Sequence, residues 1–374
     1  MTRYNHSFDS TPVFCPQIFT IVYRMTTTTV TTTPVSSHTK DTGMNTRLRV
    51  SGMLKVKKNE ASSSAMVEDT TTSSEEGEEK HRNTLLWWAT LCVISMFNMA
   101  VWLYSYRTLS LAFVELDNTG DGQQHYYYSY QQSHLVLSGI YVFVCAYRSF
   151  LPRIDLERYC LWDTPLSSIF LGRSAATVAE ICFAGQMALF LHRLGTVHDH
   201  PYSIYLSYVL VPAITIAQCF CWCGVITLNH LYHAIEESIW AIGALFVAME
   251  MGSLVLYHPE NQYLCKIGLL GCVMCLSFFW FMITVDVPMY LHRWQEGLME
   301  KSVVKMNVGM TFTRIALPPR PCRMTSMDGG RDALRRRVVT KSWDVWKEET
   351  VWLTGYFSSA VWLSLLFIHL PVVS

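Results

Sequence analysis

Histidine and carboxylate side chains gather in the stretch NHLYHAIEESIWAI, residues 229–242, at the start of a segment that is otherwise apolar. If Asn229 caps a helix there, His230, His233 and Glu237 fall at i, i+3 and i+7 and share one face. Two imidazoles and a carboxylate at this spacing can hold a divalent metal, with a carboxylate from another helix completing the coordination. The alternative is that these residues mark where a helix meets water, since Glu is favoured near a helix N-terminus.

Carboxylates also occur inside two other apolar segments, at Glu180 and at Asp286. A carboxylate at membrane depth must face the interior of a bundle, pair with a cation or stay protonated. Arg173 precedes Glu180 by two helical turns on the same face, so a structural ion pair is one interpretation. The other is catalytic, with Glu180 or Glu237 as the general acid or base and Asp286 as its partner or as a metal ligand.

Arginines alternate with acidic and apolar residues in the stretch RSFLPRIDLERYCLWD, residues 148–163. The pattern predicts a short amphipathic helix at the membrane surface, stabilised by an ion pair between Arg153 and Glu157. Together with Arg173, the side chains of Arg148 and Arg153 can bind the phosphate or carboxylate headgroup of a substrate. Ordinary enrichment of cytosolic loops in arginine is the alternative explanation.

The twelve cysteines indicate no disulfide framework, because most of them lie inside apolar segments, where a thiol acts as a small hydrophobic group. Cys219, Cys221 and Cys223 are spaced at i, i+2 and i+4. On a helix this spacing spreads the thiols over different faces instead of directing them at one metal ion. We therefore expect these three cysteines to pack against other apolar groups.

The elements that must position these groups are long apolar segments. Of the 374 residues, 51% are hydrophobic and only 16% are charged, which is too apolar for an ordinary soluble domain. The net charge of zero produces no overall field that would attract nucleic acid. We expect a protein that resides in a lipid bilayer, acts on a small lipid or solute, and has no nucleic-acid partner.

Seven apolar segments come near the length of ~20 residues that crosses a bilayer as a helix. They predict an all-α, polytopic membrane bundle of about seven transmembrane helices over residues 84–372. The second segment is the weakest, because its first part is polar, and an interfacial position is the alternative. The predicted spans are 84–104, 133–151, 167–192, 204–228, 236–257, 266–290 and 350–370.

The ends of the chain and its loops predict an orientation. Residues 1–83 are rich in Thr, Ser and charged groups and cannot bury enough apolar surface to fold, so we expect a disordered tail. Lys and Arg concentrate in this tail, in the loop after the second span and in the long basic loop 291–349, which places all three in the cytosol. The first forty residues weakly resemble an organelle transit peptide, so a plasma or an organelle membrane is possible.

Three functions agree with these observations. The first is a membrane-embedded enzyme acting on a lipid or isoprenoid-like substrate, because most candidate groups gather near one end of the bundle. The second is a proton- or ion-coupled transporter, because Glu180, Gln186, Gln218 and Glu250 distribute polarity through the membrane depth. The third is an accessory subunit whose buried charges are structural. Glycine loops for phosphate, nucleophile elbows and paired zinc CxxC motifs do not occur in the sequence.

Overall fold

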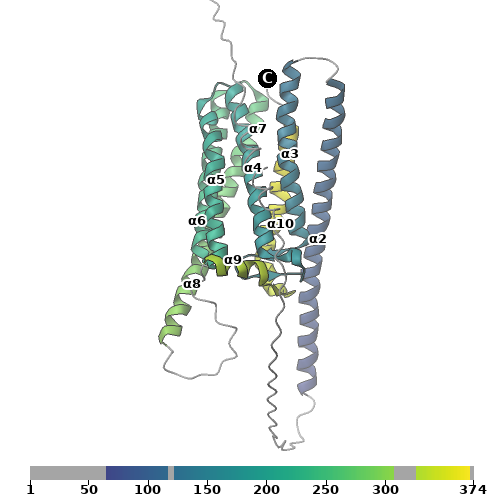
Figure 1. Ribbon diagram of the computed structural model, residues 1–374, viewed down its shortest axis with the longest axis vertical. Coiled ribbons are helices and arrows are strands. Elements are labelled where there is room, and N and C mark those ends of the chain that lie inside the picture. The colour runs from purple at the N-terminus through teal and green to yellow at the C-terminus, as the bar shows by residue number, and fades with distance from the viewer. Residues whose placement is uncertain (1–64, 117–121, 307–325, 371–374) are drawn as a thin grey trace, which may run out of the picture. The chain divides into compact units, whose positions relative to one another are not determined.

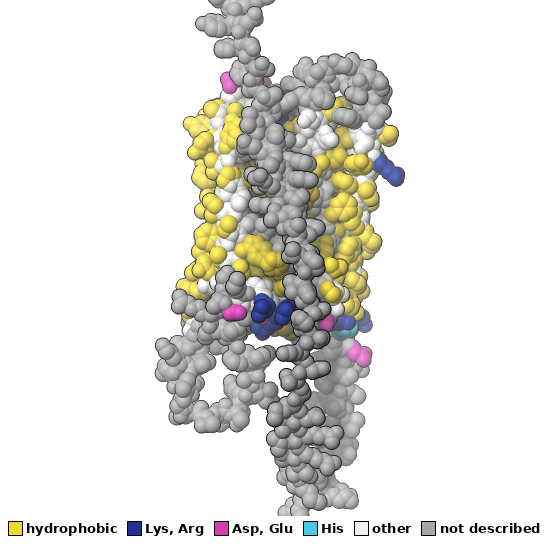
Figure 2. Space-filling view, viewed as in Figure 1, with side chains coloured by type: hydrophobic (Ala, Val, Ile, Leu, Met, Phe, Trp, Pro, Cys, Tyr) yellow, Lys and Arg dark blue, Asp and Glu magenta, His cyan; other side chains and the backbone are white. Residues whose placement is uncertain are grey.

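The computed structural model of the chain describes residues 65–116, 122–306 and 326–370. These residues are almost entirely helical, which confirms the all-α prediction, and the only strands among them are three of two residues each. Six helical segments are long and apolar enough to cross a membrane. Large apolar side chains lie on their outer surface, and Figure 2 shows hydrophobic groups along the helices and charged groups at their ends. These are the features of a multi-pass membrane protein.

The long helices run back and forth side by side (Figure 1). A 3₁₀ turn, η1 (Pro165–Ser167), precedes the third of them. Two π-helical turns, η2 (Met282–Asp286) and η4 (Tyr356–Ala360), join consecutive helices into single spans. The helices are α2 (Ala65–Leu116), α3 (Gly122–Phe150), α4 (Ile169–Val197), α5 (Pro201–Thr227), α6 (His230–Tyr257), α7 (Gln262–Phe281), α8 (Val287–Met306), α9 (Ser326–Arg335), α10 (Trp343–Gly355) and α11 (Val361–His369). The connections from α4 to α5, α5 to α6 and α6 to α7 are short.

The segment predicted as the second span forms α3, which is not among the six apolar helices. It is 29 residues long, but its first half is rich in Gln, Tyr and His. Its second half is nevertheless an inner element, because Tyr141, Val142 and Cys145 are buried and this helix packs against α4, η4 and α11. Six spans therefore meet the criteria of length and composition, and the count of seven stays a prediction, as does the orientation.

The first helix begins earlier than the sequence predicts. It starts at Ala65, inside the segment 1–83 that we expected to be a disordered tail, while residues 1–64 lie outside the described part of the chain. Glu and Lys are good helix formers, so the acidic run 75–80 continues a helix instead of interrupting it.

The segment predicted as an amphipathic surface helix is instead a hairpin. β1 (Arg153–Ile154) pairs antiparallel with β2 (Tyr159–Cys160). Arg158 adopts a left-handed conformation with a φ of 62°, which a right-handed helix cannot accommodate. A third strand, β3 (Val338–Val339), lies parallel to β2 and completes the order β1-β2-β3.

The segment 291–349, predicted as a basic loop, is partly folded onto one end of the helices. Nε of Arg158 lies 3.1 Å from the Oδ2 of Asp332 on α9, and the same guanidinium donates to the carbonyl of Val225 at the end of α5. Gly329 of α9 packs so closely on Ile226 that a Cβ would overlap the Ile226 carbonyl oxygen. We call the folded unit of residues 153–160 and 326–340 the cap.

The buried apolar side chains form two main clusters, and α4 contributes to both. One cluster joins α2, α3, α10 and α11 around Trp87, Tyr141 and Trp346, and it includes Ala179 of α4. The other joins α4, α5 and α6 around residues such as Leu191. Because α4 packs on two sides, its polar side chains are held in the interior of the bundle.

Candidate functional site

A tight turn between α5 and α6 builds the site. Leu228 takes a left-handed conformation with a φ of 54°, and the side chain of Asn229 accepts a hydrogen bond from the Leu231 amide at 3.1 Å, as expected of a helix cap. The two helices return antiparallel from this turn, so residues equally distant from it lie at the same level of the bundle. Cys221 of α5 and Glu236 of α6 are such a pair.

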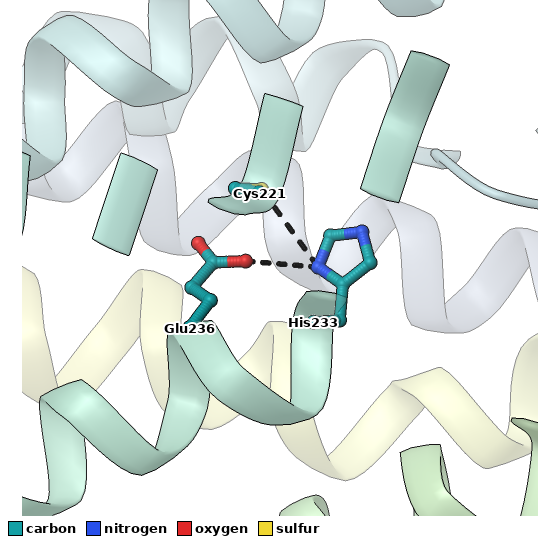
Figure 3. Close-up of side chains that lie close together, drawn as sticks. All are labelled: Cys221, His233 and Glu236. Atoms are coloured by element: carbon teal, nitrogen blue, oxygen red, sulfur yellow. Dashed lines mark hydrogen bonds and ion pairs between the residues drawn. The ribbon is translucent and has the colours of Figure 1, made fainter. Parts of the chain in front are cut away.

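Cys221, His233 and Glu236 form a compact buried group (Figure 3). Nδ1 of His233 lies 2.8 Å from Oε2 of Glu236 and 3.7 Å from Sγ of Cys221. All three side chains are buried, and one ligand atom of each lies within 4.8 Å of the others. A thiol, an imidazole and a carboxylate are the groups that bind zinc in proteins.

A guanidinium and an amide connect Glu236 to α4. Nη2 of Arg173 lies 2.9 Å from Oε1 of Glu180 and 3.5 Å from Oε1 of Glu236. The Gln218 side chain accepts from Arg173 at 2.5 Å and donates to Glu180 at 2.5 Å and to Glu236 at 3.3 Å. The predicted pair of Arg173 and Glu180 therefore forms, but as part of a larger network that also includes α5 and α6.

Two further carboxylates leave the negative charge of this region unbalanced. Asp286 is only 4% exposed, and its Oδ2 has no hydrogen-bond partner among the described residues. The charges of Glu236 and His233 act on it. Glu237 is half-buried, and it interacts electrostatically with Glu180, Glu236 and Asp286. Of these four carboxylates, Glu180 and Glu236 form ion pairs with Arg173, whereas the charges of Arg148 and Arg293 also act on Glu180 and Asp286, respectively.

A pocket of about 380 Å³ is lined in part by three residues of the cap, Ile154, Glu157 and Tyr159. Its lining also includes His230, Arg293 and Glu349. Nε2 of His230 lies 3.9 Å from Oε1 of Glu157. The ring of Tyr290 stacks against His230, with centroids 6.2 Å apart, and against His233 at 5.3 Å. Tyr290 and His230 thus connect the pocket to the buried group.

The structure brings together a different set of metal-ligand candidates from the predicted one. Of His230, His233 and Glu237, only His233 belongs to the compact group, and Cys221 and Glu236 are its neighbours. Spacing along one helix could not show this, because the thiol comes from α5. A signal was nevertheless present, since Cys221 and Glu236 are equally distant from the turn.

The predicted catalytic carboxylates lie in one region, as the preceding contacts show, and their catalytic role stays a prediction. The predicted headgroup arginines are more dispersed. Arg153 is buried, donates to the Ser168 carbonyl at 2.8 Å and lies over the Tyr147 ring at 4.7 Å. Burial lowers the pKa of this guanidinium, because removal from water disfavours its charged form. Arg148 lies 5.8 Å from the ring centroid of Phe357.

No protein-family model, curated protein or solved structure matches this chain. The chemistry of the site is therefore argued from its geometry. The buried carboxylates and imidazole can take up protons, and the thiol, imidazole and carboxylate can take up a cation.

Proposed function

We propose that this multi-pass membrane protein is an ion-coupled transporter and that the network around Arg173 and Glu236 is its ion-binding site. The observation that carries the proposal is the surplus of buried carboxylates over Arg173. Ionised carboxylates in a helical interior are costly unless a cation or a proton compensates them. The ring of Tyr290 stacks against His230, which lines the pocket, and against His233 of the network, so only this ring pair separates the pocket from the proposed site.

Arg173 is placed to couple two carboxylates. It lies between Glu180 and Glu236, at 2.9 Å and 3.5 Å, and Gln218 bridges the same pair. When a cation or a proton neutralises Glu236, the attraction of the guanidinium to Glu236 weakens and its attraction to Glu180 dominates. When no cation or proton is bound to Glu236, the guanidinium of Arg173 interacts with the carboxylates of both Glu180 and Glu236. With two such states, the binding of a cation or a proton at Glu236 of α6 changes the interaction of Arg173 with Glu180 on α4.

A lipid-modifying enzyme is a second candidate, favoured by one observation. An apolar groove of about 770 Å³ between α2 and α3, lined by Trp102, Leu135, Phe143 and their neighbours, can accommodate an acyl chain. Its lining includes none of the predicted catalytic carboxylates. If the enzyme hypothesis holds, membranes from cells carrying Glu237→Ala should accumulate a lipid that is absent with the unaltered chain. Identical lipid profiles would exclude it.

Proton flux into liposomes tests the transport proposal. Purified protein, reconstituted with a pH-sensitive dye inside the vesicles, should dissipate a pH gradient, and Glu180→Gln should abolish this flux. The matched control is Glu260→Gln, because Glu260 is an exposed carboxylate in the connection after α6. Flux equal to that of empty liposomes, or an unchanged rate in a folded Glu180→Gln variant, would contradict the proposal.

A further inference from the structure

We propose that Cys221, His233 and Glu236 bind a divalent transition metal of the zinc type, with Asp286 as the fourth ligand. This inference names the ion of the proposed transport site. It rests on that proposal only for the movement of the ion. Binding itself is argued from the geometry of Cys221, His233 and Glu236 and from the buried carboxylate oxygen of Asp286, which finds no hydrogen-bond partner in the described part of the chain.

The separations of the ligand atoms fit a tetrahedral ion. Bonds of about 2.0 to 2.3 Å from zinc to nitrogen, oxygen and sulfur place neighbouring ligand atoms about 3.3 to 3.7 Å apart. Nδ1 of His233 lies 3.7 Å from the thiol sulfur of Cys221 and 2.8 Å from the carboxylate of Glu236. The second distance is that of a hydrogen bond, so a metal replaces a shared proton and separates these two atoms by roughly half an ångström.

Asp286 supplies the second, independent observation. Its side chain is almost fully buried, and Oδ2 has no hydrogen-bond partner among the described residues. Its electrostatic neighbours include Glu236 and His233, two of the three proposed ligands. A buried carboxylate oxygen without a partner is costly, and coordination to a cation removes that cost. The π-helical turn η2 holds Asp286 in this position.

The donor set selects the class of metal. Thiolate and imidazole ligands favour zinc and related transition metals, whereas magnesium and calcium prefer sites made only of oxygen ligands. Arg173 leaves Oε2 of Glu236 available to a metal. The guanidinium lies near Oε1, whereas Nδ1 of His233 lies near Oε2. One carboxylate can therefore bind the metal with one oxygen and the guanidinium with the other.

Gly224 of α5 fixes the position of the histidine. A Cβ at this residue would lie 2.9 Å from Cδ2 and 3.1 Å from Nε2 of His233. The imidazole is thus held between the backbone of α5 and the ring of Tyr290, which stacks against it. Gly224→Ala should displace the ring while leaving all four ligands in the sequence.

Metal binding by the full-length protein tests the inference. The protein is purified in detergent, stripped with a chelator and titrated with Co²⁺, whose absorption reports thiolate coordination, and then with Zn²⁺, measured by elemental analysis. We expect one ion per chain and a thiolate-to-cobalt band. Cys221→Ser should remove that band and weaken binding by about tenfold or more. The matched control is Cys223→Ser, which alters an exposed cysteine of the same helix and should leave binding unchanged.

Three results would overturn the inference: no stoichiometric metal in the unaltered chain, cobalt absorption without a thiolate band, or equal affinities in Cys221→Ser and Cys223→Ser. Gly224→Ala provides a second measurement should Cys221→Ser fail to fold, and full-affinity binding in that folded variant would likewise contradict it. A failure of the transport proposal can be distinguished from a failure of the metal site. Stoichiometric metal in a chain that carries neither protons nor Zn²⁺ into liposomes refutes transport alone, and proton flux in a chain that binds no metal refutes the metal site alone.

Discussion

Arg173 and Glu180 form an ion pair across two turns of α4, with Nη2 2.9 Å from Oε1. Arg173→Met leaves the carboxylates of Glu180 and Glu236 buried without their guanidinium, and breaking a buried pair in this way costs about 3–5 kcal/mol. We expect a large fall in the thermal unfolding temperature in detergent. Combining Arg173→Met with Glu180→Gln should restore part of the loss. A single variant as stable as the unaltered chain would contradict a structural contribution of the pair.

The docking of α9 can be tested with two adjacent glycines. A Cβ at Gly329 would overlap the carbonyl oxygen of Ile226, whereas a Cβ at Gly330 would meet nothing within 4 Å. Gly329→Ala should therefore displace the cap and expose it to limited proteolysis. Gly330→Ala should be neutral or stabilise α9 by about 0.5–1 kcal/mol, because alanine is the better helix former. Equal proteolysis of both variants would contradict the tight contact.

The thiol of Cys160 should report whether the cap is closed. Burial in the sheet raises the pKa of this thiol above its ordinary value, and the charge of Asp163 raises it further. The thiolate is the reactive form, so at pH 8 Cys160 should be alkylated more slowly in the folded chain than in denaturant. Asp332→Asn removes the ionic partner of Arg158 and should accelerate the reaction. Peptide mass spectrometry between pH 7 and 9 measures these rates.

An unchanged alkylation rate in Asp332→Asn would show that the ion pair does not hold the cap closed. The control is Asp344→Asn, which removes an exposed partner of Lys347 outside the cap. It should leave the rate at Cys160 as it is in the unaltered chain.

The features that follow from composition and helical period could be predicted from the sequence. These features depend on residues close together in the chain. They are the apolar segments, the pairing of Arg173 with Glu180 and the helix N-cap formed by Asn229. The hairpin at 153–160 could not be predicted, because the strand that completes its sheet lies at 338–339. The prediction that Cys221 packs against apolar groups was wrong for a related reason, because its neighbours are His233 and Glu236. Its environment depends on how α5 is rotated against α6, which no pattern within one helix reveals.

The connection between α4 and α5 should make stability depend on pH. Burial lowers the pKa of His198, and the neighbouring His258 and His200 lower it further, with the rings of His198 and His258 5.0 Å apart. The folded chain therefore favours neutral His198. This contribution to stability is present above the ordinary histidine pKa of about 6.5 and is lost as the pH falls below it.

Thermal unfolding between pH 7.5 and 5 tests the sign of this dependence. The unfolding temperature of His198→Gln should fall less on acidification than that of the unaltered chain. The control is His292→Gln, which alters an exposed histidine of α8. Parallel curves for His198→Gln and the unaltered chain would contradict the prediction.

The side chain of Asn229, which caps the N-terminus of helix α6, should be replaceable by another side chain that offers an oxygen acceptor. Asn229→Ala removes the acceptor for the Leu231 amide and should cost about 1 kcal/mol of stability, whereas Asn229→Ser should retain most of it. Because this turn also sets the position of His233, Asn229→Ala should weaken Co²⁺ binding as well. Chemical denaturation measures the first effect. Equal stability of the two variants would show that the side-chain hydrogen bond is unimportant.

Arg158 and Asp332 lie 174 residues apart in the chain. During translation, the guanidinium is therefore made long before the carboxylate that pairs with it, and it must stay hydrated while α4 to α8 assemble. The hairpin can complete its sheet only after the last third of the polypeptide has left the ribosome. A nascent chain that stops before α9 should thus expose the end of α5 and be a substrate for quality-control proteases, even though five of its six apolar helical segments are already complete.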